Sequence, residues 1–171
     1  VYADGKGPKY DYTPDGKLSR RTWARGIVTD YAYDGWGNPT NTVYSDNTHG
    51  VSRCFDALGR QTEIKDAAGT TSLYYDAFGS MTNEIVISGT QTNGIGRSWD
   101  NYGRMTAYTL NGVRQALFDY DEATSRIASM LPYDLAEPFE WSYIQGSHLK
   151  SELLYPCGLA AFWRYDINGQ V

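Results

Sequence analysis

The sequence predicts an all-β fold, an antiparallel meander of β-hairpins with about two strands in every 22 residues. The first observation behind this prediction is a short motif that returns at regular spacing along almost the whole chain. The second is a turn signal, usually a glycine, about every 10 or 11 residues. The third is hydrophobic patterning of period two, since no segment shows the 3.6-residue period of an amphipathic helix of ordinary length.

The motif consists of an aromatic residue, an aspartate, two variable residues and a glycine, followed by a polar residue. Complete copies begin at Tyr33, Phe55, Tyr75, Trp99 and Tyr165. Weaker copies begin at Tyr12, which lacks the aspartate, at Tyr120, which lacks the glycine, and at Tyr143, where the glycine comes one place early. Successive copies are 20 to 24 residues apart, so we predict a single array of about eight repeats over residues 1–171.

These repeat anchors are the candidate functional residues, and their predicted role is structural. They are Tyr12, Gly16, Tyr33, Asp34, Gly37, Phe55, Asp56, Gly59, Tyr75, Asp76, Gly79, Trp99, Asp100, Gly103, Tyr120, Asp121, Tyr143, Tyr165, Asp166 and Gly169. In the copy at Tyr120, Thr124 stands at the place of the glycine. The aspartates suit Asx turns, in which the carboxylate accepts a hydrogen bond from its own turn. A column of cation ligands is the alternative, although calcium-binding solenoids repeat every nine residues with paired glycines.

Further glycines near mid-repeat predict a second set of turns. They are Gly5, Gly26, Gly50, Gly69, Gly112 and Gly158. Several pairs are strong hairpin signals, because Gly and Asn tolerate the positive φ of tight turns. These pairs are Asp4-Gly5, Asp15-Gly16, Asn93-Gly94, Asn111-Gly112 and Asn168-Gly169. The segment 130–140 carries two prolines and is expected to form a longer loop.

Segments of about seven to nine residues separate the turns, which suits β-strands. Alternation places Phe139, Trp141 and Tyr143 on one face, and the other anchors share a face with their own partners in the same way. We therefore expect neighbouring repeats to stack their anchor rings as a ladder. Because an isolated hairpin is only marginally stable, stability should come from contacts between neighbouring repeats.

The motif resembles the YD repeat, also called the RHS repeat. The copies that carry the resemblance are Phe55-Asp56-Ala57-Leu58-Gly59-Arg60, Trp99-Asp100-Asn101-Tyr102-Gly103-Arg104 and Tyr33-Asp34-Gly35-Trp36-Gly37-Asn38. This family includes bacterial Rhs and wall-associated polymorphic toxins, the shell-forming subunits of insecticidal toxin complexes, and the animal teneurins. The resemblance implies that the chain is a curved segment of a larger hollow β-shell, in a secreted or cell-surface protein of a bacterium.

The resemblance also implies partners. In the toxins the shell encloses a C-terminal effector, and in the teneurins the barrel supports cell adhesion. We therefore expect a fragment of a longer chain, with further repeats and a C-terminal effector as its partners, that encapsulates this effector or supports cell-surface interaction. The Asp-Pro dipeptide of the family's self-cleaving segment does not occur in the sequence. Sheet edges left open would also allow self-association.

Composition and motifs argue against several functions. The net charge of −5 and the pI of about 4.9 disfavour nucleic acid and anionic membranes, and we expect no membrane insertion, since no run of about 18 apolar residues occurs. We expect no metal, no cofactor and no catalysis. His49 and His148 do not form a zinc pattern with the cysteines, and His49 and Cys54 are interpreted as a loop residue and a strand residue. Cys54 and Cys157 are interpreted as unpaired, with a disulfide as the alternative in an oxidising compartment.

The aromatic content of 15% keeps a second function open. The alternative is a carbohydrate- or cell-wall-binding repeat module that uses exposed aromatic rows, with a cell-surface glycan as its partner. The tryptophans count against this reading because they occupy no common position in the repeat. They are Trp23, Trp36, Trp99, Trp141 and Trp163.

Overall fold

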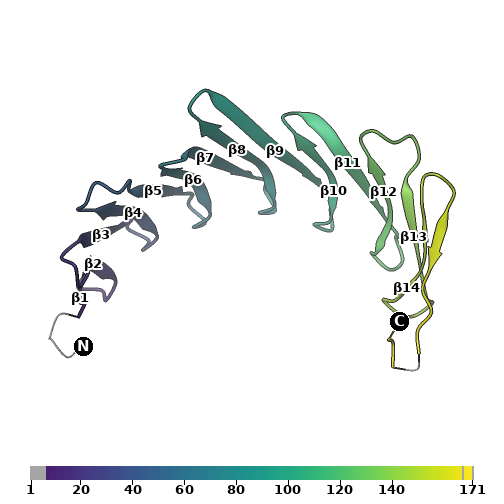
Figure 1. The fold of residues 1–171 in the computed structure, drawn as a ribbon, viewed down its shortest axis with the longest axis horizontal. Coiled ribbons are helices and arrows are strands. Elements are labelled where there is room, and N and C mark those ends of the chain that lie inside the picture. Colours follow the sequence, from purple (N-terminus) through teal and green to yellow (C-terminus); the bar gives the residue numbers. More distant parts are fainter. Residues whose placement is uncertain (1–6, 167, 171) are drawn as a thin grey trace. The chain divides into compact units, whose positions relative to one another are not determined.

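The computed structural model describes residues 7–166 and 168–170, which contain fifteen β-strands and no helix (Figure 1). The strands are β1 (Lys9–Tyr12), β2 (Leu18–Thr22), β3 (Val28–Tyr33), β4 (Pro39–Tyr44), β5 (Val51–Phe55), β6 (Gln61–Asp66), β7 (Gly69–Tyr75), β8 (Met81–Ser88), β9 (Gln91–Trp99), β10 (Met105–Leu110), β11 (Val113–Tyr120), β12 (Ile127–Pro132), β13 (Phe139–Tyr143), β14 (Lys150–Leu154) and β15 (Ala160–Phe162). The strand order in the sheet follows the chain from β1 to β15. The predicted all-β antiparallel meander is confirmed. No part of the chain that the structure describes forms a helix of the length and apolar character needed to cross a membrane.

The chain divides into two compact units. Unit 1 comprises Val1–Tyr75 and Asn83–Asn93, and unit 2 comprises Asp76–Thr82 and Gly94–Val171. Neighbouring strands within each unit pair in antiparallel register, from β1 to β7 in unit 1 and from β9 to β15 in unit 2. A single array of about eight repeats over residues 1–171 stays a prediction.

A β-bulge follows each anchor turn whose strand pairing is resolved within a unit. Between β1 and β2 the register shifts between Asp11 and Tyr12, which leaves Ser19 as the extra residue. Thr40 of β4 and Thr62 of β6 are the extra residues of the next two repeats. In unit 2 the same place is taken by Thr106, Ala128 and Ser151. A bulge bends its strand and increases the local twist, so each repeat contributes one such bend.

The sequence carries a signal for these bulges that the motif analysis missed. A threonine stands three residues after the motif glycine in the complete copies that begin at Tyr33, Phe55, Tyr75 and Trp99. Examples are Gly59 followed by Thr62 and Gly103 followed by Thr106. A small hydroxyl side chain at this position coincides with the extra residue of the bulge.

Side-chain burial is slight throughout both units. Among the described residues, only Ala116 and Thr29 are buried, with 4% and 1% of their surface exposed. The predicted alternation is present, since Phe139, Trp141 and Tyr143 of β13 are half-buried while the residues between them are exposed. With so little buried surface, stability has to come from contacts between neighbouring strands and turns rather than from a central core.

The turn predicted at Asn93-Gly94 is wrong. The pair Asn93-Gly94 lies inside β9, and the preceding hairpin turns instead at Gly89, which has a φ of 57°. The reason is that Gly94 is tied into the sheet, because its N–H donates to Asn111 Oδ1 and its carbonyl accepts from Asn111 N, both at 2.7 Å. By contrast, Asn111 and Gly112 form the predicted turn, with φ values of 50° and 79°.

The loop expected over the segment 130–140 is present but shorter than that segment. β12 continues through Pro132 and β13 begins at Phe139, so the loop covers 133–138. Pro132 is the last residue of its strand, where the missing N–H costs no ladder hydrogen bond. The predicted turn at Asp4-Gly5 lies outside the described residues.

Candidate functional site

The motif residues form one kind of turn at the end of each anchor strand. Asp56 N–H donates to Arg60 O at 2.9 Å, and Gly59 N–H donates to Asp56 O at 3.0 Å. The same two hydrogen bonds close the turns that begin at Asp34, Asp76, Asp100 and Asp166. Gly59 has a φ of 76°, a left-handed conformation that glycine adopts without steric cost. The turn therefore explains the fixed spacing between aspartate and glycine.

The aspartate carboxylate holds the inside of this turn. Asp56 Oδ1 accepts hydrogen bonds from Leu58 N and Arg60 N, both at 2.9 Å. The same acceptor pattern occurs at Asp34, Asp76, Asp100 and Asp166. Hydrogen bonds from Arg60 lower the pKa of Asp56, because they favour the charged form. The Asx-turn interpretation is confirmed, and the described residues contain no group of three or more His, Cys, Asp or Glu placed to hold a metal ion.

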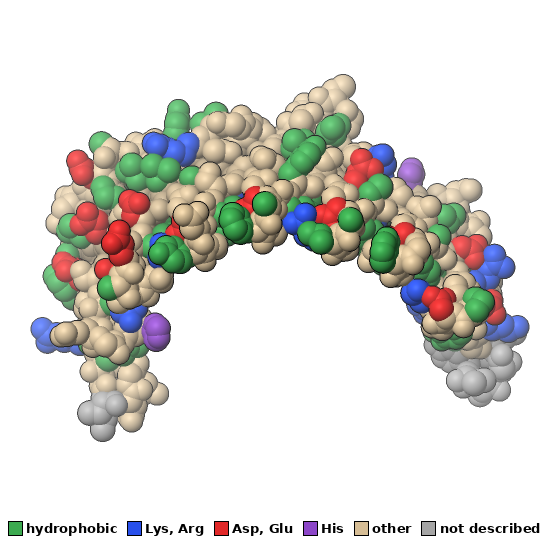
Figure 2. Space-filling view, turned by 180° about the vertical axis from the view of Figure 1, so that it is seen from behind, with side chains coloured by type: hydrophobic (Ala, Val, Ile, Leu, Met, Phe, Trp, Pro, Cys, Tyr) green, Lys and Arg blue, Asp and Glu red, His purple; other side chains and the backbone are tan. Residues whose placement is uncertain are grey.

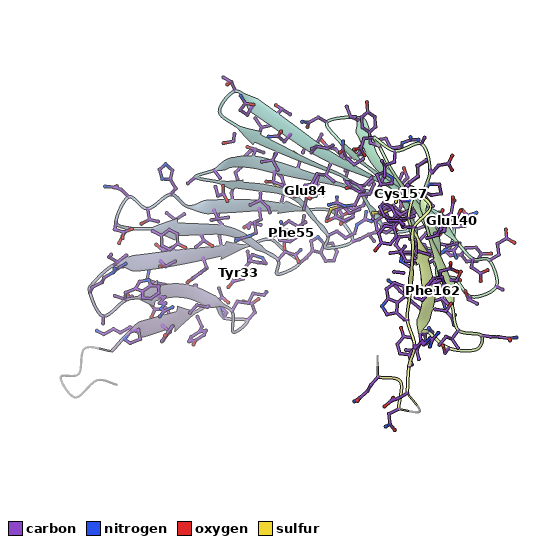
Figure 3. All side chains as sticks on the ribbon, turned by 45° about the vertical axis from the view of Figure 1, so that its right-hand side comes forward. Tyr33, Phe55, Glu84, Glu140, Cys157 and Phe162 are labelled. Carbon is purple, nitrogen blue, oxygen red and sulfur yellow. The ribbon has the colours of Figure 1, made fainter. Side chains whose placement is uncertain are left out.

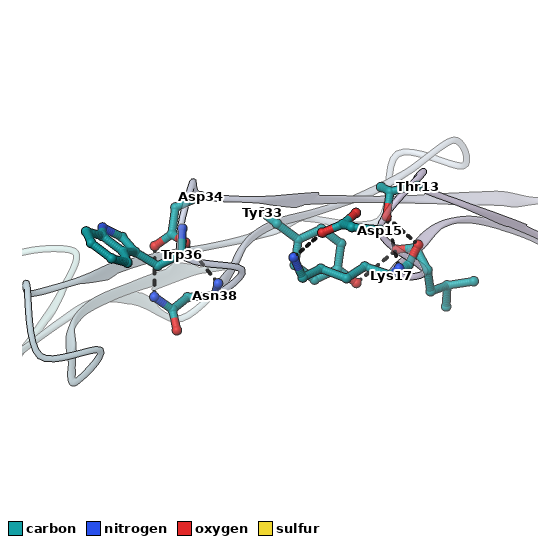
Figure 4. A network of polar contacts seen from close by, with 8 residues as sticks. Thr13, Asp15, Lys17, Tyr33, Asp34, Trp36 and Asn38 are labelled. Atoms are coloured by element: carbon teal, nitrogen blue, oxygen red, sulfur yellow. Dashed lines mark hydrogen bonds and ion pairs between the residues drawn. The ribbon is translucent and has the colours of Figure 1, made fainter.

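The turn also forms where the sequence departs from the motif. In the first repeat Thr13 replaces the aspartate, and its Oγ1 accepts from Lys17 N at 2.9 Å (Figure 4). Lys17 also pairs with Asp15, and this hydrogen bond lowers the pKa of Asp15 to about 2. Two mid-repeat turns, which begin at Trp23 and Tyr155, have the same backbone hydrogen bonds as the motif turn.

The turn after Tyr120 is one residue longer than the motif turn. Asp121 N–H donates to Arg126 O at 2.8 Å, five residues on rather than four. The placement of Thr124 at the glycine position is therefore wrong. Ser125 holds that position instead, with a φ of 57° and with its N–H donating to Asp121 O at 2.8 Å.

The turn after Tyr143 has the same extra length. Ile144 N–H donates to Leu149 O at 2.9 Å. This hydrogen bond places Leu149 at the position of Arg60 and Arg104 in the motif turns, so this turn carries no cation there. Both departures from the motif are visible in the sequence, but the extra residue that the two turns share is visible only in their hydrogen bonds.

The arginine after the motif glycine is paired with the motif aspartate. Arg60 Nε lies 2.7 Å from Asp56 Oδ2, and Arg104 Nε lies 2.6 Å from Asp100 Oδ2. The side chains of the second pair are only about 20% exposed, and a charge-assisted hydrogen bond is strongest when it is partly shielded from water. In the copy at Tyr33, Asn38 Nδ2 takes this role and donates to Asp34 Oδ2 at 2.9 Å (Figure 4).

The same cation also lies against the anchor ring of the next repeat. The Arg60 guanidinium is 4.6 Å from the centre of the Tyr75 ring, and that of Arg104 is 4.5 Å from the Tyr120 ring. Lys17 over Tyr33 and Arg126 over Tyr143 repeat this arrangement at 5.7 and 5.1 Å. Each such cation–π contact contributes about 0.5–1 kcal/mol at a partly exposed site. The motif arginine thus joins two successive repeats.

Five anchors with a polar tip also donate a hydrogen bond back to the preceding repeat. Tyr75 Oη donates to Gln61 O at 2.8 Å, and Gln61 is the residue opposite Phe55, the preceding anchor. Equivalent bonds run from Tyr33 to Leu18 O, from Trp99 Nε1 to Met81 O, from Tyr120 to Met105 O and from Tyr143 to Ile127 O. Sequence analysis could not single out this bond, because its acceptor is a backbone carbonyl that every residue carries.

The expected ladder of stacked anchor rings is wrong in this detail. The ring pairs seen among the described residues are Tyr108 with Phe118 and Phe139 with Tyr155, and neither pair joins two anchors. Tyr33 and Phe55 end β3 and β5 at the same edge of unit 1 (Figure 3). They are two strands apart, about 9.5 Å, beyond the 4.5–7 Å over which rings pair. Between other anchors a cation and a carbonyl bridge this interval, as Arg104 and Met105 O do for Tyr120.

The residue before the motif glycine projects into solvent. It is large and apolar in four copies, with exposed fractions of 86% for Trp36, 76% for Leu58, 90% for Phe78 and 81% for Tyr102. Trp36 and Leu58 lie on successive turns of unit 1, and Phe78 and Tyr102 on successive turns of unit 2. Hydrophobic side chains are visible at the surface beside charged ones (Figure 2). We refer to these four side chains as the turn-tip residues.

His49 and Cys54, the pair considered for nucleophilic chemistry, do not line one cavity in the described part of the chain. Cys54 lies in β5 with its Sγ 3.8 Å from Glu63 Oε1. His49 lies outside the strands and lines a cavity of about 300 Å³ with Lys65 and Asp66, whereas Cys54 does not line it. The interpretation of His49 and Cys54 as a loop residue and a strand residue is confirmed. Cys54 and Cys157 are both free and exposed.

The motif turn and the antiparallel meander fit the resemblance of this sequence to YD-repeat, or RHS-repeat, proteins. Two solved structures have a similar fold, the crystal structure of TcdB2-TccC3-Cdc42 and the structure of the Photorhabdus luminescens Tc holotoxin pore with the mutation TccC3-D651A. Each matches with a TM-score of 0.65 and 12% sequence identity, over 86% of this chain and 9% of the other. These likenesses confirm, at the level of the fold, the resemblance to the family that the motif indicates.

Two curated proteins are similar in sequence. They are the tRNA nuclease WapA of Bacillus subtilis and the tRNA3(Ser)-specific nuclease WapA of Bacillus spizizenii, each 30% identical over 115 residues that cover 65% of this chain. The chain spans 4% of the length of each. No protein-family model matches the chain.

Proposed function

We propose that this chain is part of the wall of an Rhs-type shell, in a longer secreted or cell-surface bacterial protein, and that it takes no part in catalysis. The observation that carries the proposal is the coupling of anchor turns to the next repeat through Lys17, Arg60, Arg104 and Arg126. At Arg104, one side chain pairs with Asp100 in its own turn and lies over Tyr120 in the following one. Such contacts join only neighbouring repeats, so a sheet held by them can be extended by adding further repeats. A compact core cannot be extended in this way.

The comparisons support this proposal in two ways. The similar solved structures contain toxin-complex proteins, and the sequence relatives are much longer proteins that are nucleases by name. We infer that an effector activity of the longer protein belongs to another part of it, because the aspartates of the motif here are engaged by their own turns. The expected partners are further repeats and a C-terminal effector.

Electron microscopy and limited proteolysis of the longer protein would test the proposed wall. We expect a hollow particle in which the C-terminal part resists protease until the particle is opened by denaturant. A double substitution, Arg60→Ala with Arg104→Ala, should make that part accessible at lower denaturant concentration. The exposed Arg114→Ala serves as a matched control and should leave protection unchanged. An extended particle with a freely digested C-terminal part would contradict the proposal.

Shortening the 171-residue chain offers a second test. Removing one repeat at a time from the C-terminal side should lower the free energy of unfolding with each repeat lost, because each repeat is stabilised by its neighbour. A series of shortened chains that all unfold at one common temperature would contradict this expectation.

Glycan binding is a second candidate function, favoured by one observation. The turn-tip residues include three aromatic side chains, all more than 80% exposed, and an exposed aromatic ring can pack against the C–H face of a sugar. Retention on peptidoglycan that is lost in the double variant Trp36→Ala with Tyr102→Ala would support this function. The matched control is Tyr133→Ala, which removes an aromatic ring that is 60% exposed and lies outside the motif turns. Equal retention of both variants would contradict the role of the turn tips.

A further inference from the structure

A cavity of about 400 Å³ lies between the two turns of unit 2 that are one residue longer than the motif turn. Its lining includes Asp121, Thr124 and Arg126 of the first turn, and Trp141, Tyr143 and Gln145 of the following hairpin. This volume is at the lower end of the range of pockets that hold small molecules, about 300–1,000 Å³. The cavity therefore occurs where the repeat pattern is broken.

Arg126 is the arginine of this broken repeat, and it differs from its counterparts in one contact. Arg60 and Arg104 donate their Nε–H groups to Asp56 and Asp100. Among the described residues, the buried Nε of Arg126 has no hydrogen-bond partner. Its guanidinium keeps the other contact of the motif and lies 5.1 Å from the centre of the Tyr143 ring.

The extra residue in the turn explains the missing contact. Asp121 Oδ1 accepts hydrogen bonds from Thr124 N at 2.7 Å and from Thr124 Oγ1 at 2.6 Å. These bonds direct the carboxylate to its own longer turn, so it does not reach Arg126 as Asp100 reaches Arg104. A buried donor without a partner costs free energy, so a shift of the Arg126 side chain that brings its guanidinium against an acceptor in the cavity is favoured.

Arg21 provides a useful contrast. Its Nε is also buried and without a hydrogen-bond partner among the described residues. Its guanidinium, however, lies 3.4 Å from the centre of the Trp23 ring and 5.6 Å from that of Tyr10, and Arg21 does not line the cavity at Arg126. Aromatic rings therefore lie against Arg21, whereas Arg126 borders a space large enough for a ligand.

The remaining lining suits a ring-shaped polar ligand. Trp141 offers an aromatic surface, and Thr124, Ser142 and Gln145 offer hydroxyl and amide groups. Lys150 Nζ lies 5.6 Å from the centre of the Trp141 ring and adds a positive charge nearby. The negative charge of Asp121 repels an anionic group from its side of the cavity. A negative group of a ligand is therefore expected beside Arg126.

We propose that this cavity binds a carboxylated saccharide of the uronic acid class, with its carboxylate on Arg126 and its ring against Trp141. The ligand's carboxylate takes the place at Arg126 that Asp56 and Asp100 take at their own arginines. Arginine and carboxylate form strong charge-assisted hydrogen bonds. The proposal does not depend on the wall function or on glycan binding at the turn tips, because the cavity lies on different residues.

The test is a titration of the 171-residue chain with D-galacturonate, followed by the Nε–H signal of Arg126 in proton–nitrogen NMR spectra. We expect a saturable shift of this signal, and binding of D-galactose and of acetate that is weaker by about tenfold or more, since each lacks one half of the recognised group. Galactose binding as tightly would overturn the role of the charge. Acetate binding as tightly would overturn the role of the ring, and no saturable shift would overturn the proposal altogether.

A variant that restores the motif makes the test specific. Deleting Thr124 and substituting Ser125→Gly converts the turn to Asp-Glu-Ala-Gly-Arg, so Asp121 should pair with Arg126 and close the site. We expect a thermal midpoint at least as high as that of the parent chain and affinity for D-galacturonate reduced about tenfold or more. Unchanged affinity in this folded variant would overturn the proposal.

Arg126→Gln keeps the proposal testable even if the shortened turn does not fold. This variant should lose D-galacturonate binding, followed through the indole signal of Trp141, whereas Arg104→Gln should bind as the parent chain does. Arg104 is the matched control because it lies over an anchor ring as Arg126 does but does not line the cavity. Equal binding by the two variants would overturn the assignment of the carboxylate to Arg126.

Discussion

The guanidinium of Arg104 lies 4.5 Å from the centre of the Tyr120 ring, although the two residues belong to successive repeats. Tyr120 in turn donates a hydrogen bond to Met105 O at 2.8 Å, next to Arg104 in the chain. The anchors Tyr33, Tyr75, Tyr120 and Tyr143 are each held to the preceding repeat twice, once by a cation and once by a backbone carbonyl. Because few side chains are buried among the described residues, we expect these contacts to dominate the stability of the sheet.

Phe55 is the anchor that has no polar tip, and it predicts a stabilising substitution. In four other copies the anchor donates to the residue opposite the preceding anchor. For Phe55 that residue is Pro39, which lies opposite Tyr33. Phe55→Tyr should therefore gain one hydrogen bond and raise the free energy of unfolding by about 0.5–1.5 kcal/mol. Chemical denaturation of the variant and the parent chain measures this difference.

Tyr75→Phe is the matched control for that substitution. It removes the hydrogen bond to Gln61 O and leaves the ring under Arg60, so it should lower the free energy of unfolding by about 0.5–1.5 kcal/mol. If both substitutions change stability in the same direction, the anchor hydroxyl does not have the role described here.

Gly69 and Gly103 should respond very differently to replacement by alanine. Both have positive φ, but a Cβ at Gly69 would lie 1.9 Å from Ile87 O, whereas one at Gly103 would meet nothing within 4 Å. Gly103→Ala should cost only the left-handed conformation, about 1–2 kcal/mol. Gly69→Ala should cost more than about 4 kcal/mol, because backbone has to move. Equal thermal midpoints for the two variants would contradict the close approach at Gly69.

Acid should weaken the motif turns. Hydrogen bonds from Arg60 lower the pKa of Asp56. At Asp100 burial acts to raise the pKa, but the hydrogen bonds from Arg104 and Tyr102 together lower it. A carboxyl whose pKa is lower in the folded chain stabilises the fold fully above its unfolded value, about 3.9. This contribution is lost as the pH falls through the lower folded value. Stability measured from pH 7 to pH 2 should therefore fall in the acidic part of this range.

The double variant Asp56→Asn with Asp100→Asn isolates this effect. Asparagine keeps an oxygen for the turn but carries no charge to pair with arginine. The stability difference between the parent chain and the variant should be largest near pH 7 and should shrink below about pH 4. A difference that stays constant down to pH 2 would contradict the contribution of the charged aspartates.

The period of the motif was sufficient to predict the strands, their order and the Asx turns. The aspartate and the glycine are informative because the turn needs their side-chain chemistry and backbone freedom, as at Asp56 and Gly59. The turn at Gly89 was missed because Asn93-Gly94 has the stronger hairpin signal, while Gly94 is held inside β9 by Asn111. Local propensity was overridden there by a contact from the next hairpin.

The links between repeats were harder to predict from the sequence. Their acceptors are backbone carbonyls, such as Gln61 O, which leave no trace in residue type. The contact of the motif arginine with the anchor ring of the next repeat was also hard to predict. It depends on the spacing of the strands, which keeps successive anchor rings too far apart to stack on each other. Arg126 and its cavity were not predicted because they arise from one extra residue in a turn whose glycine is missing.

A double-mutant cycle on Arg104 and Tyr120 tests the coupling between repeats most directly. The free energies of unfolding of Arg104→Ala, Tyr120→Leu and the double variant should give an interaction energy of about 0.5–1 kcal/mol. The same cycle on Arg114 and Tyr120, which lie about 20 Å apart along β11, should give a value near zero. An interaction energy for Arg104 and Tyr120 no larger than that of the control pair would contradict the claim that this contact holds successive repeats together.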